Sequence, residues 1–215
     1  MTELLCYSDL SELKAKVLAC TATDDGLWAV TLDKTIFHPQ GGGQPSDAGT
    51  LNGEPLIKAI HTENGIVHLV ASAIEGEVLL KLDARVRLLH SRLHSAGHLI
   101  GYVGDLKGWH AYKGNHFPGQ GKVSFRPDVE TLANLSLPGA EALQNEVNEY
   151  VREALPFNET WEGQKRSVTW GDLPAYACGG THVKNTAEIG TILISKIKCK
   201  KGEISVSYHL ENEKS

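Results

Sequence analysis

Short runs of alternating apolar and polar residues, separated by turn-forming pairs, make up the chain from residue 11 to residue 82. The segment AKVLACTATDDGLWAVTLD predicts two strands joined by an Asp-Asp-Gly turn at residues 24–26. Gly49, Asn52-Gly53 and Asn64-Gly65 mark further turns, and EVLLKLD at residues 77–83 predicts the last strand of this run. Many short strands with regular turns predict a small β-barrel.

The pattern changes after Asp83, where apolar residues recur every three or four positions. This period is typical of one face of an α-helix, and Asp83 is a suitable N-terminal cap for it. We therefore predict a helix from Ala84 to about Tyr102. Its apolar stripe consists of Val86, Leu89, Leu93, Ala96 and Ile100.

The rest of the chain predicts several strands and one more helix. Strands are expected at residues 121–125, 158–168, 191–194 and 203–208, the last two forming a hairpin. A helix is expected from Pro138-Gly139 to about Leu155, before Pro156. Together these elements predict an α+β protein with two domains, residues 1–83 and 84–215. Because no flexible linker separates them, we expect the small β-barrel to pack on the second domain.

The composition is that of an ordinary globular protein. The 215 residues carry a net charge of −5, and no apolar run approaches the roughly 20 residues of a membrane span. The N-terminal segment MTELLCYSDL lacks the basic and apolar regions of a secretory signal. Cys6, Cys20 and Cys199 show no disulfide-framework spacing, so we expect a cytoplasmic protein with reduced thiols.

Three histidines, His90, His94 and His98, stand four residues apart on the predicted helix. Residues four apart lie on the same helix face, so two such imidazoles can bind one metal ion. One pair alone is a weak signal, because histidines are common on helix faces. By spacing alone His90 could replace His94 or His98. A straight helix drifts round over two turns, however, so we interpret His90 as a residue beside the site or on the surface.

A second motif, ACGGTHV, places Cys178 and His182 on either side of three small residues. Its glycines predict a tight loop that brings a thiolate and an imidazole together. With His94 and His98, the set offers three nitrogen ligands and one sulfur ligand, which suit tetrahedral zinc. The two motifs together predict a shared zinc site far more strongly than either does alone.

HSAGH followed by CGGTHVKNTAEIG resembles the editing domain shared by alanyl- and threonyl-tRNA synthetases. The chain is most similar to the free-standing alanyl-tRNA editing proteins, the AlaX family. HPQGGGQPSDAG, at residues 38–49, resembles a second motif of the longer members, which carry an N-terminal barrel. The resemblance implies a barrel like those of translation proteins, followed by an α/β editing domain of the alanyl/threonyl-tRNA synthetase type.

The resemblance also implies an activity, that of a trans-editing hydrolase. Its substrate would be tRNA-Ala wrongly charged with serine or glycine, and its partner the acceptor end of that tRNA. The bond cut would be the ester between the amino acid and the terminal ribose. Zinc with three protein ligands could activate water, whereas four protein candidates favour a metal that positions substrate or water.

Two further residues are candidates for the chemistry. In the family the glycine-rich loop approaches the editing pocket, which implies that Gln44 lies near the substrate and that Asp47 braces the loop. Ser95 directly follows His94, where relatives usually have threonine in HTAxH, and the resemblance gives this residue the role of recognising the serine hydroxyl. The alternative is that Ser95 only bonds back to its own helix, as mid-helix serines often do.

Two other functions fit parts of the pattern. A zinc peptidase of the HExxH type needs a glutamate directly after the first histidine, but Ser95 stands there. A structural-zinc module that binds RNA is usually smaller and richer in cysteine. Both alternatives are therefore disfavoured against the editing hydrolase.

Basic residues gather in two places although the chain is acidic overall. One group surrounds the predicted metal helix and the other lies near the end of the chain: Lys81, Arg85, Arg87 and Arg92, and Lys196, Lys198, Lys200 and Lys201. Such runs are usually solvated faces, but a protein that holds a tRNA end needs local positive charge.

The segment KGNHFPG departs from the Gln-Lys-Gly-Ser type of sequence that many relatives have in this region. His110 and His116 lie in or beside it. Either could enter the metal site, but we interpret both as exposed loop histidines.

Overall fold

The computed structural model describes residues 2–63, 65–127, 139–200 and 202–213. The chain forms two compact units, Met1–Leu88 and Leu89–Ser215. Most of its regular structure is sheet, accompanied by two α-helices in the described residues. In that part of the chain, neither helix is long and apolar enough to cross a membrane.

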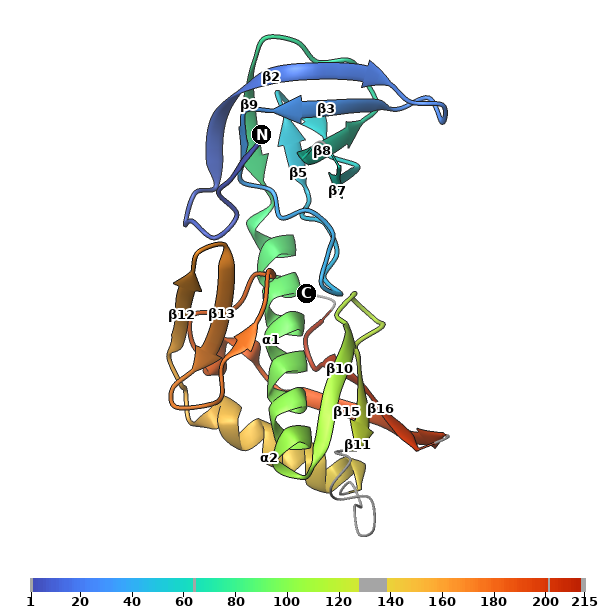
Figure 1. Cartoon of the computed structure of the whole chain (residues 1–215), viewed down its shortest axis with the longest axis vertical. Coiled ribbons are helices and arrows are strands. Elements are labelled where there is room, and N and C mark those ends of the chain that lie inside the picture. The colour runs from blue at the N-terminus through green and yellow to red at the C-terminus, as the bar shows by residue number, and fades with distance from the viewer. Residues whose placement is uncertain (1, 64, 128–138, 201, 214–215) are drawn as a thin grey trace. The chain divides into compact units, whose positions relative to one another are not determined.

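The first unit is built on a seven-stranded sheet with the order β6-β5-β9-β2-β3-β8-β7 (Figure 1). Its strands are β2 (Glu12–Ala22), β3 (Trp28–Leu32), β5 (Gly49–Leu51), β6 (Glu54–Pro55), β7 (Lys58–Thr62), β8 (Gly65–Val70) and β9 (Glu77–Leu82). A separate parallel pair joins β1 (Glu3–Leu4) to β4 (Lys34–Thr35). The predicted turn between β2 and β3 is confirmed, and Gly26 adopts the positive φ of 82° that the turn requires.

Strand β2 lets this sheet curl around an apolar core. Its first residues pair with β9 and its later residues pair with β3, so one long strand serves two halves of the sheet. Val30, Leu32, Phe37, Leu51 and Leu80 are buried between these halves. Among the described residues β6 and β7 form the two edges of the sheet. The closed barrel and its packing on the second domain therefore remain predictions.

Helix α1 (Ala84–Leu106) begins in the first unit and continues through the second. The predicted cap is confirmed, because the Asp83 carboxylate accepts hydrogen bonds from the backbone N–H groups of Arg85 and Val86. The helix runs beyond the predicted end at Tyr102 to Leu106, and the missing side chain at Gly104 leaves room for the ring of Phe125. A Cβ added at Gly104 would lie 2.2 Å from that ring.

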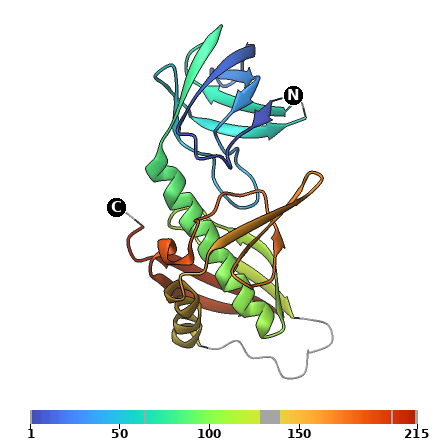
Figure 2. The ribbon, with the colours of Figure 1, turned by 90° about the vertical axis from the view of Figure 1, so that its left-hand side faces the viewer.

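The second unit contains two sheets, with α1 between them in both views (Figures 1 and 2). One has the order β10-β11-β16-β15 and comprises β10 (Trp109–Asn115), β11 (Lys122–Pro127), β15 (Ile192–Lys200) and β16 (Glu203–Leu210). The other comprises β12 (Phe157–Glu162), β13 (Lys165–Trp170) and β14 (Tyr176–Ala177). The remaining elements are α2 (Ala140–Arg152) and the short 3-10 helix η1 (Thr186–Ile189).

The core of the second unit lies between α1, α2 and one face of the four-stranded sheet. Leu93, Ala96 and Ile100 of the predicted stripe are buried there, against Phe125 and Val206 of the sheet. Burying each large side chain contributes about 1.5–3 kcal/mol, so this face fixes the rotation of α1 and thereby the direction of its histidines. Val86 and Leu89 are only partly buried.

Three predictions for this unit need correction. The predicted loop before residue 121 contains β10, and the single strand predicted at residues 158–168 is a hairpin, β12–β13, with Gly163 at its turn. The second helix ends at Arg152 rather than at about Leu155. The hairpin of β15 and β16 is confirmed. Asn64, Pro138 and Lys201 lie outside the described residues.

Candidate metal centre

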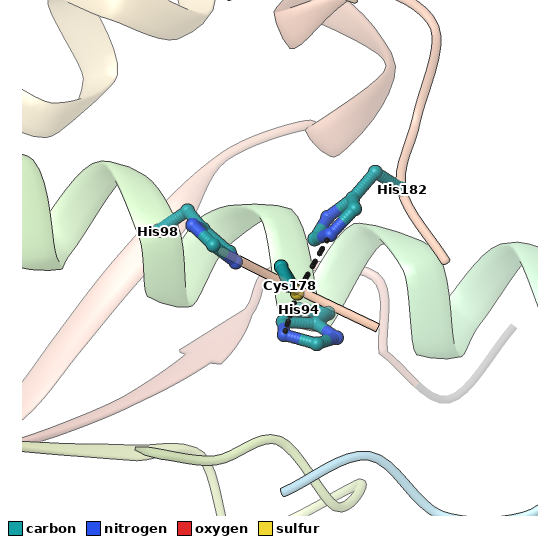
Figure 3. Close-up of side chains that lie close together, drawn as sticks. All are labelled: His94, His98, Cys178 and His182. Atoms are coloured by element: carbon teal, nitrogen blue, oxygen red, sulfur yellow. Dashed lines mark hydrogen bonds between the residues drawn. The ribbon is translucent and has the colours of Figure 1, made fainter. Parts of the chain in front are cut away.

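The four predicted ligands come together in the second unit. His94 and His98 project from α1, while Cys178 and His182 come from the loop that follows β14 (Figure 3). Their possible ligand atoms all lie within 4.8 Å of one another. His94 is buried and the other three side chains are partly buried.

Two of the distances between donor atoms match the edges of a tetrahedral site. Cys178 Sγ lies 3.5 Å from His94 Nε2 and 3.3 Å from His182 Nε2. A zinc ion with bonds of about 2.05 Å to nitrogen and 2.3 Å to sulfur separates its ligand atoms by about 3.3–3.6 Å. The observed distances are therefore those of tetrahedron edges. Three imidazole nitrogens and one sulfur are also the donor types that zinc takes in proteins.

Protonation in this cluster also fits a cation. Burial, with a smaller effect from the charge of Arg166, lowers the pKa of His98 to about 4, so its imidazole is neutral and has a lone pair to donate. Burial raises the pKa of the Cys178 thiol. A thiol in such surroundings becomes a thiolate readily only when a positive charge lies beside it.

Ser95 connects the helix to the CGGTH loop. Its side chain is fully buried, and its Oγ accepts a hydrogen bond of 3.2 Å from the backbone N–H of Val183. The same oxygen lies 3.3 Å from His182 Nδ1, the ring nitrogen that points away from Cys178. The alternative that Ser95 only bonds back to its own helix is therefore wrong. One helical turn earlier, Ser91 Oγ lies 2.7 Å from the hydroxyl of Thr181 in the same loop.

Arg166, on β13, holds this loop from the other side. Its guanidinium donates to the carbonyl oxygens of Cys178 at 3.2 Å and Gly180 at 2.8 Å. Its Nε donates to the carboxylate of Glu159 at 2.6 Å, and the whole residue is only 7% exposed. The loop that carries two of the four donors is thus tied to both α1 and β13.

His116 is buried against the cluster, so its interpretation as an exposed loop histidine is wrong. Its ring stacks on that of His94, with centroids 4.4 Å apart and an interplanar angle of 18°. Tyr208 donates its hydroxyl hydrogen to the carbonyl of Leu93 at 2.8 Å, so its oxygen accepts from His116 Nδ1 at 2.7 Å. Burial lowers the pKa of His116 to about 3, so the ring is neutral.

Gly97 of the HSAGH motif makes room for this ring. A Cβ at that position would lie 2.3 Å from His116 Cε1, which is shorter than any real contact. The glycine therefore has a steric role, which the sequence motif alone did not reveal.

Comparison with known proteins identifies the family. The model of the second additional domain of threonyl and alanyl tRNA synthetases matches residues 166–205, the stretch from Arg166 through the CGGTH loop. The alanyl-tRNA editing protein AlaX-M of Pyrococcus horikoshii is 36% identical over 203 residues, which cover 89% of this chain and 89% of that protein. The chain belongs to the family of alanyl-tRNA editing proteins.

Other members and relatives of this family are longer than the chain. The alanyl-tRNA editing protein Aarsd1 of Danio rerio is 32% identical over 189 residues, covering 77% of this chain and 44% of that protein. The alanine–tRNA ligase of Methanobrevibacter smithii is 29% identical over 229 residues, covering 91% of this chain. The chain spans only 25% of that ligase, so the likeness concerns one region of it.

The glycine-rich loop lies in the first unit. Its two ends are joined because the Asp47 backbone N–H donates to the His38 carbonyl and the His38 backbone N–H donates to the Asp47 carboxylate. The buried Asp47 carboxylate pairs with the guanidinium of Arg87, as expected of a residue that braces the loop. Gln44 is buried at the tip, where its backbone bonds to Gly41 in both directions. Its place near the substrate remains a prediction.

Of the remaining predictions, on His90, His110 and the basic residues, some are confirmed and others are wrong. His110 is exposed as predicted, with its side chain 81% exposed and paired with Asp105, but it lies on strand β10 rather than in a loop. His90 is buried, so the interpretation as a surface residue is wrong and a place beside the site remains. Arg87 and Arg92 are not free to meet a ligand, because Arg87 pairs with Asp47 and Arg92 donates to a backbone carbonyl.

Sequence motifs did not indicate the roles of Arg166 and Tyr208. Arg166 and Tyr208 bond to backbone carbonyls, which every sequence offers, so no motif announces them. For His116 the departure of KGNHFPG from the pattern of many relatives was the one available signal.

Proposed function

We propose that this protein is a trans-editing hydrolase that cleaves the ester of seryl-tRNA-Ala, with glycyl-tRNA-Ala as a second substrate. The observation that carries the proposal is the convergence of His94, His98, Cys178 and His182 in a member of the alanyl-tRNA editing family. The two relatives named as alanyl-tRNA editing proteins support tRNA-Ala as the partner.

We further propose zinc as the cofactor, held by these four residues. A zinc ion there would supply Lewis-acid chemistry, orienting and polarising the groups that react. Other side chains of the protein hold the ligand residues in position. Arg166 and Ser95 fix the loop that carries Cys178 and His182, and a ring that binds metal through Nε2 keeps its proton on Nδ1, where it donates to Ser95.

Ser95 is also the proposed reader of the serine side chain. Alanine is serine without its hydroxyl, so exclusion by size cannot reject correctly charged alanyl-tRNA. A polar contact can, because the smaller analogue leaves a buried polar group unpaired at about 1–3 kcal/mol. With Val183 N–H and His182 Nδ1 as donors to its oxygen, the Ser95 hydroxyl hydrogen is left for a third partner.

The activity itself is tested with tRNA-Ala charged with serine, glycine or alanine, alongside a peptide substrate. The expected result is rapid release of serine, slower release of glycine and little release of alanine. Cleavage of the peptide would indicate a zinc peptidase. Binding of tRNA without deacylation would indicate a structural-zinc module.

The role of Ser95 is tested by the ratio of two rates. Ser95→Ala should lower hydrolysis of seryl-tRNA-Ala at least about tenfold, or roughly 1.4 kcal/mol, and lower that of glycyl-tRNA-Ala less. Ser91→Ala is the matched control, because it removes a buried hydroxyl that contacts the same loop from one turn earlier. It should change both rates equally. If Ser95→Ala leaves the ratio of the seryl to the glycyl deacylation rate unchanged at equal zinc content, the only role of Ser95 is to position His182.

Gln44 is the second proposed catalytic residue. Gln44→Ala should lower deacylation, while circular dichroism and zinc content stay those of the parent because the side chain belongs to the other unit. Unchanged deacylation by this variant would remove Gln44 from the chemistry.

A further inference from the structure

One face of the four-stranded sheet is turned away from α1 and the core. Along β11 and β16 every second residue is buried, including Val123, Phe125, Ile204 and Val206. The residues between them point to the opposite face. Figure 1 shows no helix on that side in the described part of the second unit.

The open face is lined by lysines with serines between them. Strand register sets Lys122 opposite Ser207 and Ser207 opposite Lys196, so these three form one row across β11, β16 and β15. The next row runs across all four strands and contains Lys113, Ser124, Ser205 and Lys198. Serines on the middle strand keep the surface low between the longer lysines.

A third row adds an aromatic ring and another lysine. Arg126 pairs with Glu203 at 3.0 Å and lies over the ring of Tyr112 at 4.0 Å from its centroid. Lys200 stands opposite Glu203 on β15. The ring of Tyr112 is 43% exposed, so a flat group can reach it.

This face has a charge opposite to that of the chain. Among the described residues, its three rows carry one acidic residue, Glu203, whereas the whole protein has 26 acidic and 21 basic residues. In the part of the chain that the structure describes, five of its basic residues form no ion pair: Lys113, Lys122, Lys196, Lys198 and Lys200. They are exposed, so their charges are available to a partner.

One loop of the second unit adjoins both the open face and the metal centre. At one end the face meets a hollow of about 1000 Å³, whose lining includes Lys122, Ser207, the loop segment from Pro118 to Gly121, and the acidic residues Glu211 and Glu213. The same loop carries His116, whose ring stacks on His94. The two sides of one short loop thus contact the basic face and the metal cluster.

We propose that this face binds the phosphate backbone of the tRNA whose acceptor end enters the metal centre. The proposal rests on the proposed function and assigns it a binding surface. Lysines neutralise phosphates, serine hydroxyls donate to phosphate oxygens, and the exposed ring of Tyr112 offers a surface for stacking. The loop that carries His116 links this face to the metal cluster through the contact of His116 with His94.

The test compares two triple variants. Lys122→Gln, Lys196→Gln and Lys198→Gln remove charge from two adjacent rows of the face. Lys14→Gln, Lys16→Gln and Lys165→Gln remove the same charge from exposed positions elsewhere and serve as the control. Binding of uncharged tRNA-Ala is measured by fluorescence anisotropy over a range of salt concentrations.

The face variant should bind tRNA at least about tenfold more weakly than the parent at about 0.1 M salt. The slope of log affinity against log salt should fall by about 2 to 3, since each phosphate contact contributes about 0.7–0.9. The control variant should stay within about twofold of the parent. A face variant that binds tRNA like the control would overturn the proposal, as would a parent that binds anionic lipid vesicles but not tRNA.

A second readout separates this proposal from the proposed function. The face variant should hydrolyse seryl-adenosine, which has no phosphate backbone, as fast as the parent, while kcat/KM for seryl-tRNA-Ala falls. Equal losses on both substrates would show damage to the metal centre and refute a backbone-binding role. If the parent deacylates nothing, the proposed function fails, and the anisotropy measurements still decide whether this face binds tRNA.

Discussion

Arg166 offers the sharpest test of how the chain prepares its metal centre. The guanidinium makes three hydrogen bonds from a nearly buried position, two to carbonyls of the CGGTH loop and one to Glu159. Arg166→Met keeps a long apolar stem of similar shape and removes every donor. The carbonyls of Cys178 and Gly180 then lose a charged partner, and the loop loses its link to β13.

The size of the effect can be estimated in two ways. Leaving a buried acceptor without a partner costs about 1–3 kcal/mol, and hydrogen bonds to charged groups lie in the upper part of that range. Removing a group that orients metal ligands typically weakens metal binding about 10–100-fold, or about 1.4–2.7 kcal/mol. Both routes predict that Arg166→Met binds zinc at least about tenfold more weakly than the parent.

The assay is a competition for zinc against a chromophoric chelator of known affinity. Arg152→Met is the control, because Arg152 is exposed and its carboxylate partner Glu149 lies 3.9 Å away. It should bind zinc like the parent. If Arg166→Met also matches the parent while circular dichroism shows a native fold, the loop holds its shape without Arg166 and our account of the site is wrong.

Cys178→Ala should lower the zinc content from about one ion per chain to a small fraction, because the site loses its thiolate; metal analysis of the purified variant checks this. Burial lowers the pKa of His68 to about 4, from 6.5 in an unfolded chain, so the native state binds fewer protons between these pH values. Stability is therefore complete above about pH 6.5 and falls as the pH drops towards 4, by about 1.4 kcal/mol per pH unit. Urea unfolding measures this effect. Between pH 7 and pH 5 the free energy of unfolding should fall by about 2 kcal/mol more for the parent than for His68→Gln. An equal fall in both proteins would show that His68 is not the cause. Gly97→Ala should displace the ring of His116 and lower deacylation, and an unchanged rate would show that His116 is dispensable.

The convergence of the four candidate ligands could be predicted from the sequence because its signals are local. HSAGH fixes two donors on one helix face, and CGGTH fixes two more in one loop. The surroundings could not be predicted in this way. His116 reaches His94 only because Gly97 has no side chain and Tyr208 accepts its Nδ1 proton, and these residues come from three distant segments.

The same distinction applies to the fold. Capping by Asp83 and the turn at Gly26 depend on neighbouring residues, and both were predicted correctly. Strand β12 was merged with β13 because nearly all its residues are exposed and show no apolar alternation. Strand β10 was taken for a loop because glycines flank its sequence, and it becomes a strand only by pairing with β11. Whether these two segments form strands depends on their pairing with other segments of the chain.

The donors on α1 and in the CGGTH loop are close in space but far apart in the sequence, since His94 and Cys178 are separated by 84 residues. A metal ion that joined them would act as a reversible cross-link across that length of chain. By the chain-entropy relation for cross-links, closing a loop of this size restricts the unfolded state by roughly 4–5 kcal/mol. The stability of the three-stranded sheet, whose edge strand β12 is exposed, would depend on this metal cross-link more than that of the four-stranded sheet does. The availability of metal would then determine the stability of the folded protein as well as its activity.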